Sequence, residues 1–184
     1  MSTLFVRTGI VLLITAAVVG NLLTHADYNL ISNRLSELGG QGMPNAWIMQ
    51  FGFFAFGAGS IIAAALKFRR LPASRSAIAV FGASMVLVSL FPARSIWPEM
   101  PFDALADDLH SIFASVAGTA FGLACAARLF LRSGHIGDWL SWIGLVASVA
   151  IPLFMLQYPE FAGLPQRVMF AISAIWLWRE FRPS

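Results

Sequence analysis

Apolar residues follow one another in six long runs along the chain, and polar segments separate the runs. The runs predict helices at about residues 4–23, 46–66, 76–91, 107–131, 139–157 and 165–179. Apolar segments of this length are typical of helices that cross a bilayer, where each backbone amide must be bonded within its own segment. We therefore expect an all-α fold, a bundle of six transmembrane helices that forms one domain over residues 1–184.

The first connector, residues 24–45, is long, polar and rich in glycine. Within it, the segment 29–38 (NLISNRLSEL) carries apolar residues at helical spacing and is followed by Gly39-Gly40. This pattern predicts a short amphipathic helix or half-turn at the mouth of the bundle. The first apolar run, with Arg7 near its start and Thr24-His25-Ala26 after it, also fits a cleavable signal peptide. We interpret the run as the first helix.

Composition supports the membrane interpretation. Hydrophobic residues make up 58% of the chain and charged residues 11%, whereas soluble domains carry roughly 25% charged residues. The mean hydropathy of +0.75 agrees with this difference. The net charge of +3 comes from basic residues beside apolar runs, so the expected partner is an anionic lipid surface and not a nucleic acid. The single Cys125 cannot form an intrachain disulfide.

The basic residues indicate an orientation. Six crossings would place both chain ends and the second and fourth connectors on one side of the membrane. That side would hold nine of the twelve basic residues: Arg7, Lys67, Arg69, Arg70, Arg75, Arg128, Arg132, Arg179 and Arg182. Because basic residues mark the cytoplasmic side, we expect both termini in the cytoplasm. Most acidic residues fall on the other side, which predicts a polar, net negative mouth there.

Candidate chemistry gathers in the third connector and the helix that follows it. Asp107, His110 and Ser111 fall at i, i+3 and i+4 and so share one helical face. A carboxylate can orient an imidazole, and the imidazole can then serve as a base for a hydroxyl. These three residues are the catalytic candidates. The alternative is structural, because Asp103, Asp107 and Asp108 also suit the N-terminus of a helix.

A second possibility is a zinc site. His25, at the outer end of the first helix, could approach His110 and a carboxylate from Asp107 or Asp108, and together they could form a zinc site. Glu37, Arg94 and Arg167 are further outer-side charges, and we expect the two arginines to pair with the acidic residues. His135 and Cys125 lie toward the opposite side and are left out of the site.

Four segments together carry a family resemblance. They are SNRLSELGG after the first helix, FP at the start of the third connector, an Asp followed by DDLHSIFA, and GLPQR before the last helix. With these segments the chain resembles the DUF998 family of uncharacterised six-helix membrane proteins. The resemblance implies a six-helix topology, a bacterial inner (plasma) membrane, and a shared outer-face site at Ser36, Glu37, Asp103, His110 and Arg167. It implies no established reaction.

A looser similarity is to the CREST group of intramembrane hydrolases, which hold zinc with three histidines beside an Asp and a Ser. This chain differs from that group because it has three histidines in all, and His135 is predicted at the opposite end.

These observations lead to one functional hypothesis and two alternatives. The hypothesis is a multi-pass protein that binds a lipid or another amphipathic small molecule through its outer face, with binding and hydrolysis both open. Arg167, Glu37, Asp107 and His110 would line the polar end of the pocket. The alternatives are a small transporter or channel subunit, and a non-catalytic assembly partner within the membrane.

Overall fold

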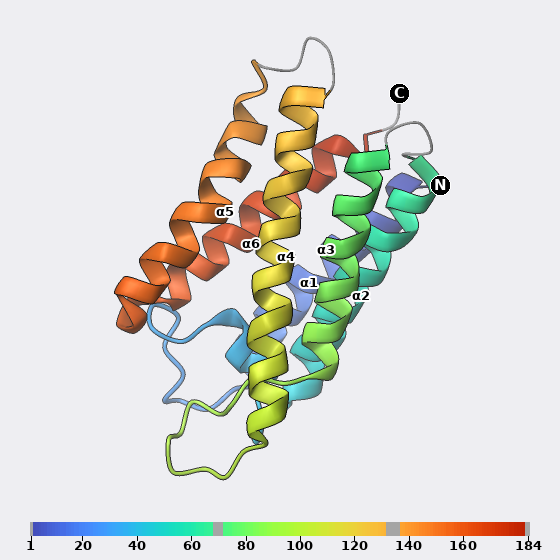
Figure 1. Cartoon of the computed structure of the whole chain (residues 1–184). Coiled ribbons are helices and arrows are strands. Elements are labelled where there is room, and N and C mark those ends of the chain that lie inside the picture. The colour runs from blue at the N-terminus through green and yellow to red at the C-terminus, as the bar shows by residue number, and fades with distance from the viewer. Residues whose placement is uncertain (1, 68–71, 132–136, 183–184) are drawn as a thin grey trace.

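Six α-helices make up most of the molecule (Figure 1). A computed structural model of the protein describes residues 2–67, 72–131 and 137–182. The helices are α1 (Ser2–Leu22), α2 (Ala46–Lys67), α3 (Pro72–Leu90), α4 (Ala104–Leu131), α5 (Trp139–Gln157) and α6 (Gly163–Glu180). Two short 3-10 helices, η1 (Leu35–Gly39) and η2 (Pro159–Phe161), lie in the connectors, and the described residues contain no strand. The all-α six-helix prediction is confirmed.

The helices pack mainly on their neighbours in sequence, from α1 on α2 through to α5 on α6. α6 also runs obliquely across the bundle and touches α1 over a small area (Figure 1). α1 begins and α6 ends at one end of the bundle, which we call the terminal end (Figure 1). The connectors 23–45 and 91–103 lie at the opposite end, which we call the connector end.

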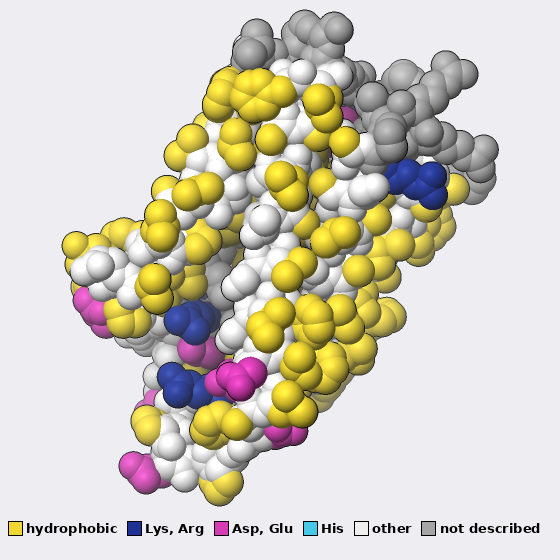
Figure 2. Space-filling model, in the orientation of Figure 1, with side chains coloured by type: hydrophobic (Ala, Val, Ile, Leu, Met, Phe, Trp, Pro, Cys, Tyr) yellow, Lys and Arg dark blue, Asp and Glu magenta, His cyan; other side chains and the backbone are white. Residues whose placement is uncertain are grey.

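Five helices, α1 to α5, are long and apolar enough to cross a membrane by length and composition. α6 has 18 residues but carries Arg167 near its start and Arg179 and Glu180 at its end. Hydrophobic side chains cover the sides of the helices in Figure 2, and most of the charged side chains in that view lie at the connector end. This distribution is that of a multi-pass integral membrane protein.

Glycines allow the first three helices to approach closely. A Cβ atom on Gly59 would lie 2.5 Å from the carbonyl oxygen of Phe5, and one on Gly57 would lie 2.5 Å from that of Gly82. Close contact through small residues is the usual packing between helices in membranes. The glycine-rich pattern of α2 therefore has a direct structural purpose.

The core is a row of aromatic rings that joins α2, α3, α4 and α6. The ring centroids of Phe56 and Phe81 are 5.4 Å apart, those of Phe81 and Phe121 are 6.2 Å apart, and those of Phe121 and Trp176 are 5.7 Å apart. Perpendicular pairs such as Phe121 with Trp176 are a favourable arrangement of aromatic rings. The row ties α6 to the rest of the bundle near the terminal end.

Three local predictions differ from the structure. α3 begins at Pro72, four residues before the expected start at residue 76. α4 begins at Ala104, three residues earlier than expected, because the side chain of Asp103 accepts a hydrogen bond from the amide of Ala106 at 3.2 Å. In the segment 29–38, only the part within η1 is helical. The side chains of Asn29 and Asn33 accept hydrogen bonds from nearby backbone amides at 2.8 Å, and such bonds compete with helix formation.

Candidate functional site

Arg167 is the centre of a polar network at the connector end. Its Nη1 donates hydrogen bonds to the carbonyl oxygens of Leu30 at 2.8 Å, Asn33 at 2.7 Å and Gly163 at 2.9 Å. Its Nη2 donates to the hydroxyl of Tyr28, which in turn donates to the carbonyl oxygen of Arg34 at 2.9 Å. One guanidinium thus fixes the first connector against the start of α6.

Backbone contacts support the same junction. The amide of Leu164 donates to the carbonyl oxygen of Ile31 at 3.1 Å. A Cβ atom on Gly163 would lie 2.4 Å from the carbonyl oxygen of Asn33, so only glycine fits at this point. Burial raises the pKa of Tyr28 to about 12, although the neighbouring Arg167 lowers it, so the phenol keeps its proton and its donor role at neutral pH.

Ser36 and Glu37 belong to this network, as structural residues of η1. The amide of Ser36, a residue 5% exposed, donates to the side-chain oxygen of Gln166 at 3.2 Å. The side chain of Gln166 also donates to the Ser36 hydroxyl at 3.4 Å. Glu37 Oε2 accepts hydrogen bonds from the Arg34 amide at 2.8 Å and from the Asn33 side chain at 3.2 Å. The carboxylate of Glu37 therefore caps η1.

Gln41 joins the first and third connectors. Its side chain donates to the carbonyl oxygens of Pro92 and Asp103, each at 3.0 Å, and accepts from the amide of Asp103 at 2.6 Å. Its own amide donates to the carbonyl oxygen of Ala93 at 2.8 Å. Asp103 thus takes part through its backbone as well as by capping α4, and one glutamine holds the two connectors together.

The three catalytic candidates do not form a hydrogen-bonded group, and the side chains of Asp107 and His110 contact backbone atoms of the third connector instead. His110 is 6% exposed, and its Nδ1 lies 2.8 Å from the carbonyl oxygen of Phe91. Asp107 accepts a hydrogen bond from the amide of Arg94 at 2.9 Å. Ser111 is exposed on the surface of α4. Among the described residues, no side-chain hydrogen bond joins Asp107, His110 and Ser111.

The expected pairing of arginines with acidic residues differs from what the structure shows. Arg167 binds backbone carbonyls, and Arg94 contacts Asp107 through its amide, with its side chain exposed. A guanidinium has five donors, so it can bind the carbonyl oxygens of Leu30 and Asn33, which lie outside the helices, as well as that of Gly163. Connector geometry, more than charge, sets the role of Arg167.

The predicted zinc ligands are held by other partners. His25 is exposed, lies 3.1 Å from the carboxylate of Asp27, and packs edge-on against Trp97 with 5.2 Å between ring centroids. His110 is directed at Phe91, as described above. Within the described residues, no group of three or more His, Cys, Asp or Glu side chains is placed to hold a metal ion. The structure therefore does not bring His25, His110 and Asp107 together as a metal centre.

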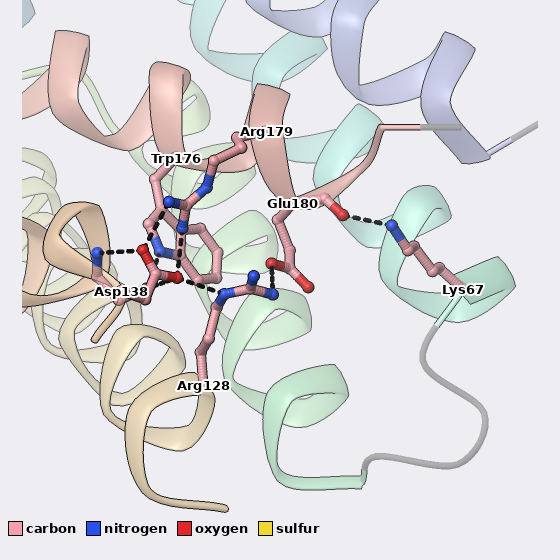
Figure 3. A network of polar contacts seen from close by, with 7 residues as sticks. Lys67, Arg128, Asp138, Trp176, Arg179 and Glu180 are labelled. Atoms are coloured by element: carbon pink, nitrogen blue, oxygen red, sulfur yellow. Dashed lines mark hydrogen bonds and ion pairs between the residues drawn. The ribbon is translucent and has the colours of Figure 1, made fainter. Parts of the chain in front are cut away.

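A second polar network lies at the terminal end (Figure 3). Asp138, just before α5, accepts hydrogen bonds from Arg128 of α4 at 2.6 Å and from both terminal nitrogens of Arg179 of α6 at 2.6 Å. Arg128 also pairs with Glu180. The Asp138 and Glu180 side chains are 8% and 4% exposed. Two arginines and two carboxylates therefore bind α4, α5 and α6 together in a buried cluster.

Other groups extend this cluster. Ser141 donates to Asp138 at 3.0 Å and accepts from the indole nitrogen of Trp176 at 2.8 Å. Lys67, at the end of α2, donates to the backbone carbonyl of Glu180. Burial raises the pKa of the Asp138 carboxyl, but hydrogen bonds from Arg179, Arg128 and Ser141 outweigh burial and hold that pKa well below its usual range. Asp138 is thus ionised at neutral pH.

Sequence reasoning assigned no role to most of these residues. Gln166 stands inside the GLPQR segment, and Asp138 stands directly before an apolar run, where a helix cap is expected. Arg128 and Arg179 served only to orient the chain in the membrane. Four residues that the sequence analysis placed on one side of the membrane lie outside the described residues, at 68–71 and 132–136: Arg69, Arg70, Arg132 and His135.

A groove of about 990 Å³ runs between α1 and α6. Its walls are apolar side chains such as Ile10, Ile14, Phe170 and Ile175. Arg167 lines it at the connector end, and Trp139, Trp178, Arg179 and Arg182 line it at the terminal end. The groove thus passes between the two polar networks. His110, Asp107 and Glu37 are not among its lining residues.

Residues 8–178 match the family described as "Protein of unknown function (DUF998)". The match covers most of the chain and includes all four segments that suggested the resemblance. No curated protein and no solved structure matches the chain.

Replacing Arg167 with lysine should free the first connector. Lysine keeps the charge but cannot hold three carbonyl oxygens and a hydroxyl in the fixed geometry of a guanidinium. Hydrogen bonds to charged groups are worth about 1.5–3 kcal/mol each, so amide exchange in residues 28–37 should rise by about tenfold or more. Hydrogen–deuterium exchange measures this directly. The exposed Arg94→Lys is the control, and equal exchange in both variants would contradict the assigned role of Arg167.

The Asp138 cluster predicts a distinct pH dependence. Its carboxyl has a lowered pKa in the folded state, so its stabilising effect is present above the unfolded value of about 3.9 and is lost as the pH falls toward the folded value. Between pH 8 and pH 5 this group should not change the thermal unfolding midpoint in detergent. When the pH is lowered below about 4, the midpoint should decrease.

At pH 7, Asp138→Asn should cost about 3–5 kcal/mol, because it leaves two arginines without their shared carboxylate. It should also weaken the acid-induced fall. The exposed Glu160→Gln provides a matched loss of one carboxylate. If both variants keep the wild-type midpoint, the cluster does not stabilise the fold as argued.

Proposed function

Because this chain belongs to the DUF998 family, whose description assigns no activity, we propose a function from the geometry: the protein binds one lipid or lipid-like amphipathic molecule in the groove between α1 and α6. The observation that carries the proposal is the groove itself. Its volume of about 990 Å³ is at the upper end of ordinary small-molecule sites. Its walls are apolar, and its polar groups are confined to the ends.

The length of the groove suits an acyl or similar hydrocarbon chain. Arg167 and Arg179 line opposite ends and stand twelve residues apart on α6, which is about 18 Å at 1.5 Å per residue. The hydrocarbon core of one leaflet is about 15 Å thick, half of the usual bilayer core. A chain of that length can lie in the groove with a polar head beside one of the ends.

Binding accounts for the contacts better than hydrolysis does. A hydrolase needs a nucleophile or an activated water within reach of a base. His110 faces the Phe91 carbonyl, Ser111 is exposed on α4, and neither lines the groove. Of the predicted binding residues, Arg167 lines it. The others, Ser36, Glu37, Arg94 and Asp103, belong to the connectors that support it.

The proposal includes a topology. We infer that α6 is the sixth crossing, because its charged residues lie at its ends and its beginning and end match those of the neighbouring helices (Figure 1). We place the terminal end in the cytoplasm of a bacterial cell, with the protein in the inner membrane. The excess of basic residues at that end supports this orientation.

Filling the groove should displace its ligand. Ala171 is exposed within the groove wall, so Ala171→Trp should occupy the space of a bound chain and reduce co-purified lipid by at least about tenfold. Native mass spectrometry of protein purified in mild detergent measures the bound lipid. Leu123→Trp is the control, because Leu123 is 60% exposed on α4 and does not line the groove. A wild-type protein without lipid, or equal loss in both variants, would overturn the proposal.

The orientation has its own test. In a Cys125→Ala background, the Glu99→Cys variant should react with a membrane-impermeant maleimide in cells whose outer membrane is permeabilised and whose inner membrane is intact. The Arg75→Cys variant, in the same background, should react only after the inner membrane is permeabilised. Both positions are exposed, at opposite ends of the bundle. The reverse pattern of labelling would place the termini outside the cytoplasm.

A further inference from the structure

The two ends of the α1–α6 groove offer different charges to a ligand. At the connector end, Nη1 of Arg167 donates to three carbonyl oxygens and Nη2 donates to the Tyr28 hydroxyl. At the terminal end, Arg182 is exposed and forms no ion pair with any residue that the structure describes. Among the groove-lining cations that the structure describes, Arg182 is therefore the one whose guanidinium donates to no other protein group.

Arg7 of α1 supplies a second cation near that end, although it does not itself line the groove. It lies one turn beyond Ile10 on α1, and its guanidinium stacks over the ring of Trp178 with 4.5 Å to the centroid. Trp178 lines the groove. The Nε of Arg7 is buried without a hydrogen-bond partner in the described part of the chain. α1 and the residues that follow α6 thus each place an arginine near the same end of the groove.

The nearby carboxylates are already in use. Asp138 is shared by Arg128 and Arg179, and Glu180 pairs with Arg128. The described residues of this end carry two carboxylates against six cationic side chains: Arg7, Lys67, Arg75, Arg128, Arg179 and Arg182. Unpaired charges at the edge of the hydrocarbon region are costly, so an external anion is favoured at this place.

From these observations we propose that the ligand is an anionic phospholipid of the leaflet at the terminal end, with its phosphate held between Arg7 and Arg182 and one acyl chain in the groove. This inference rests on the proposed function. Arginine matches phosphate because its planar guanidinium can donate two parallel hydrogen bonds. Trp139 and Trp178 stand at the same end, and indole rings favour the depth of lipid headgroups.

The test compares two lipids with identical acyl chains, phosphatidylglycerol and phosphatidylcholine. Delipidated full-length protein is mixed with equal amounts of both, and native mass spectrometry counts the bound lipids. Wild type should retain phosphatidylglycerol at least about tenfold better than phosphatidylcholine. Arg182→Gln should lower this preference by threefold or more, and Arg7→Gln combined with Arg182→Gln should abolish it while leaving phosphatidylcholine binding unchanged.

Arg75→Gln is the matched control. It removes one exposed cation from the same end but lies at the start of α3, away from the groove, and should keep the wild-type preference. Because Arg7 packs on Trp178, the double variant is compared with wild type by its thermal midpoint. If it fails to fold, the decision passes to Arg182→Gln, whose side chain is exposed beyond the end of α6.

The outcomes separate this inference from the function on which it rests. Retention of both lipids without preference, or a preference equally reduced by Arg75→Gln, would overturn the assignment of an anionic head while leaving groove binding intact. Retention of neither lipid by wild type would overturn the proposed function itself. If Arg182→Gln keeps the wild-type preference for phosphatidylglycerol, the lipid phosphate is not bound at the terminal end of the groove.

Discussion

Polar contacts at its two ends hold α6 in the bundle. At the connector end, Arg167 binds carbonyl oxygens of the first connector, and at the terminal end Arg179 binds Asp138. In the membrane interior, apolar side chains gain little by leaving lipid for another helix, so association depends on packing and on hydrogen bonds. The polar contacts at the ends of α6 therefore add to the packing of its middle, where the ring of Trp176 lies against that of Phe121.

The groove follows from this arrangement. α1 packs closely on α2 through Gly9 and Gly59, whose absent side chains let backbones touch. α6 lacks such a seam against α1 and touches it over a small area, so the space between the two helices stays open. The same tethers that fix α6 define the ends of the groove. Structural polar residues and ligand-facing residues are thus neighbours, and Arg167 and Arg179 contribute to both.

The fold could be predicted from the sequence because each membrane helix is a long run of apolar residues. The helix bounds fell within a few residues of those observed, and local polar capping, such as that by Asp103, explains the shifts. The site was harder to predict, because spacing places Asp107 and His110 on one face without revealing that each is bound by backbone atoms of the third connector. Contacts between distant segments, such as Ser36 with Gln166, leave no periodic signal.

The most direct test of this account is an experimental density map of the protein in nanodiscs made from native lipid extract. We expect an elongated non-protein density between α1 and α6, bounded by Ile14 and Ala171, with its head beside Arg7 and Arg182. The ends of α6 should remain bound through Arg167 and Arg179. A map in which α1 and α6 pack directly along their length, with no space between them, would contradict the account.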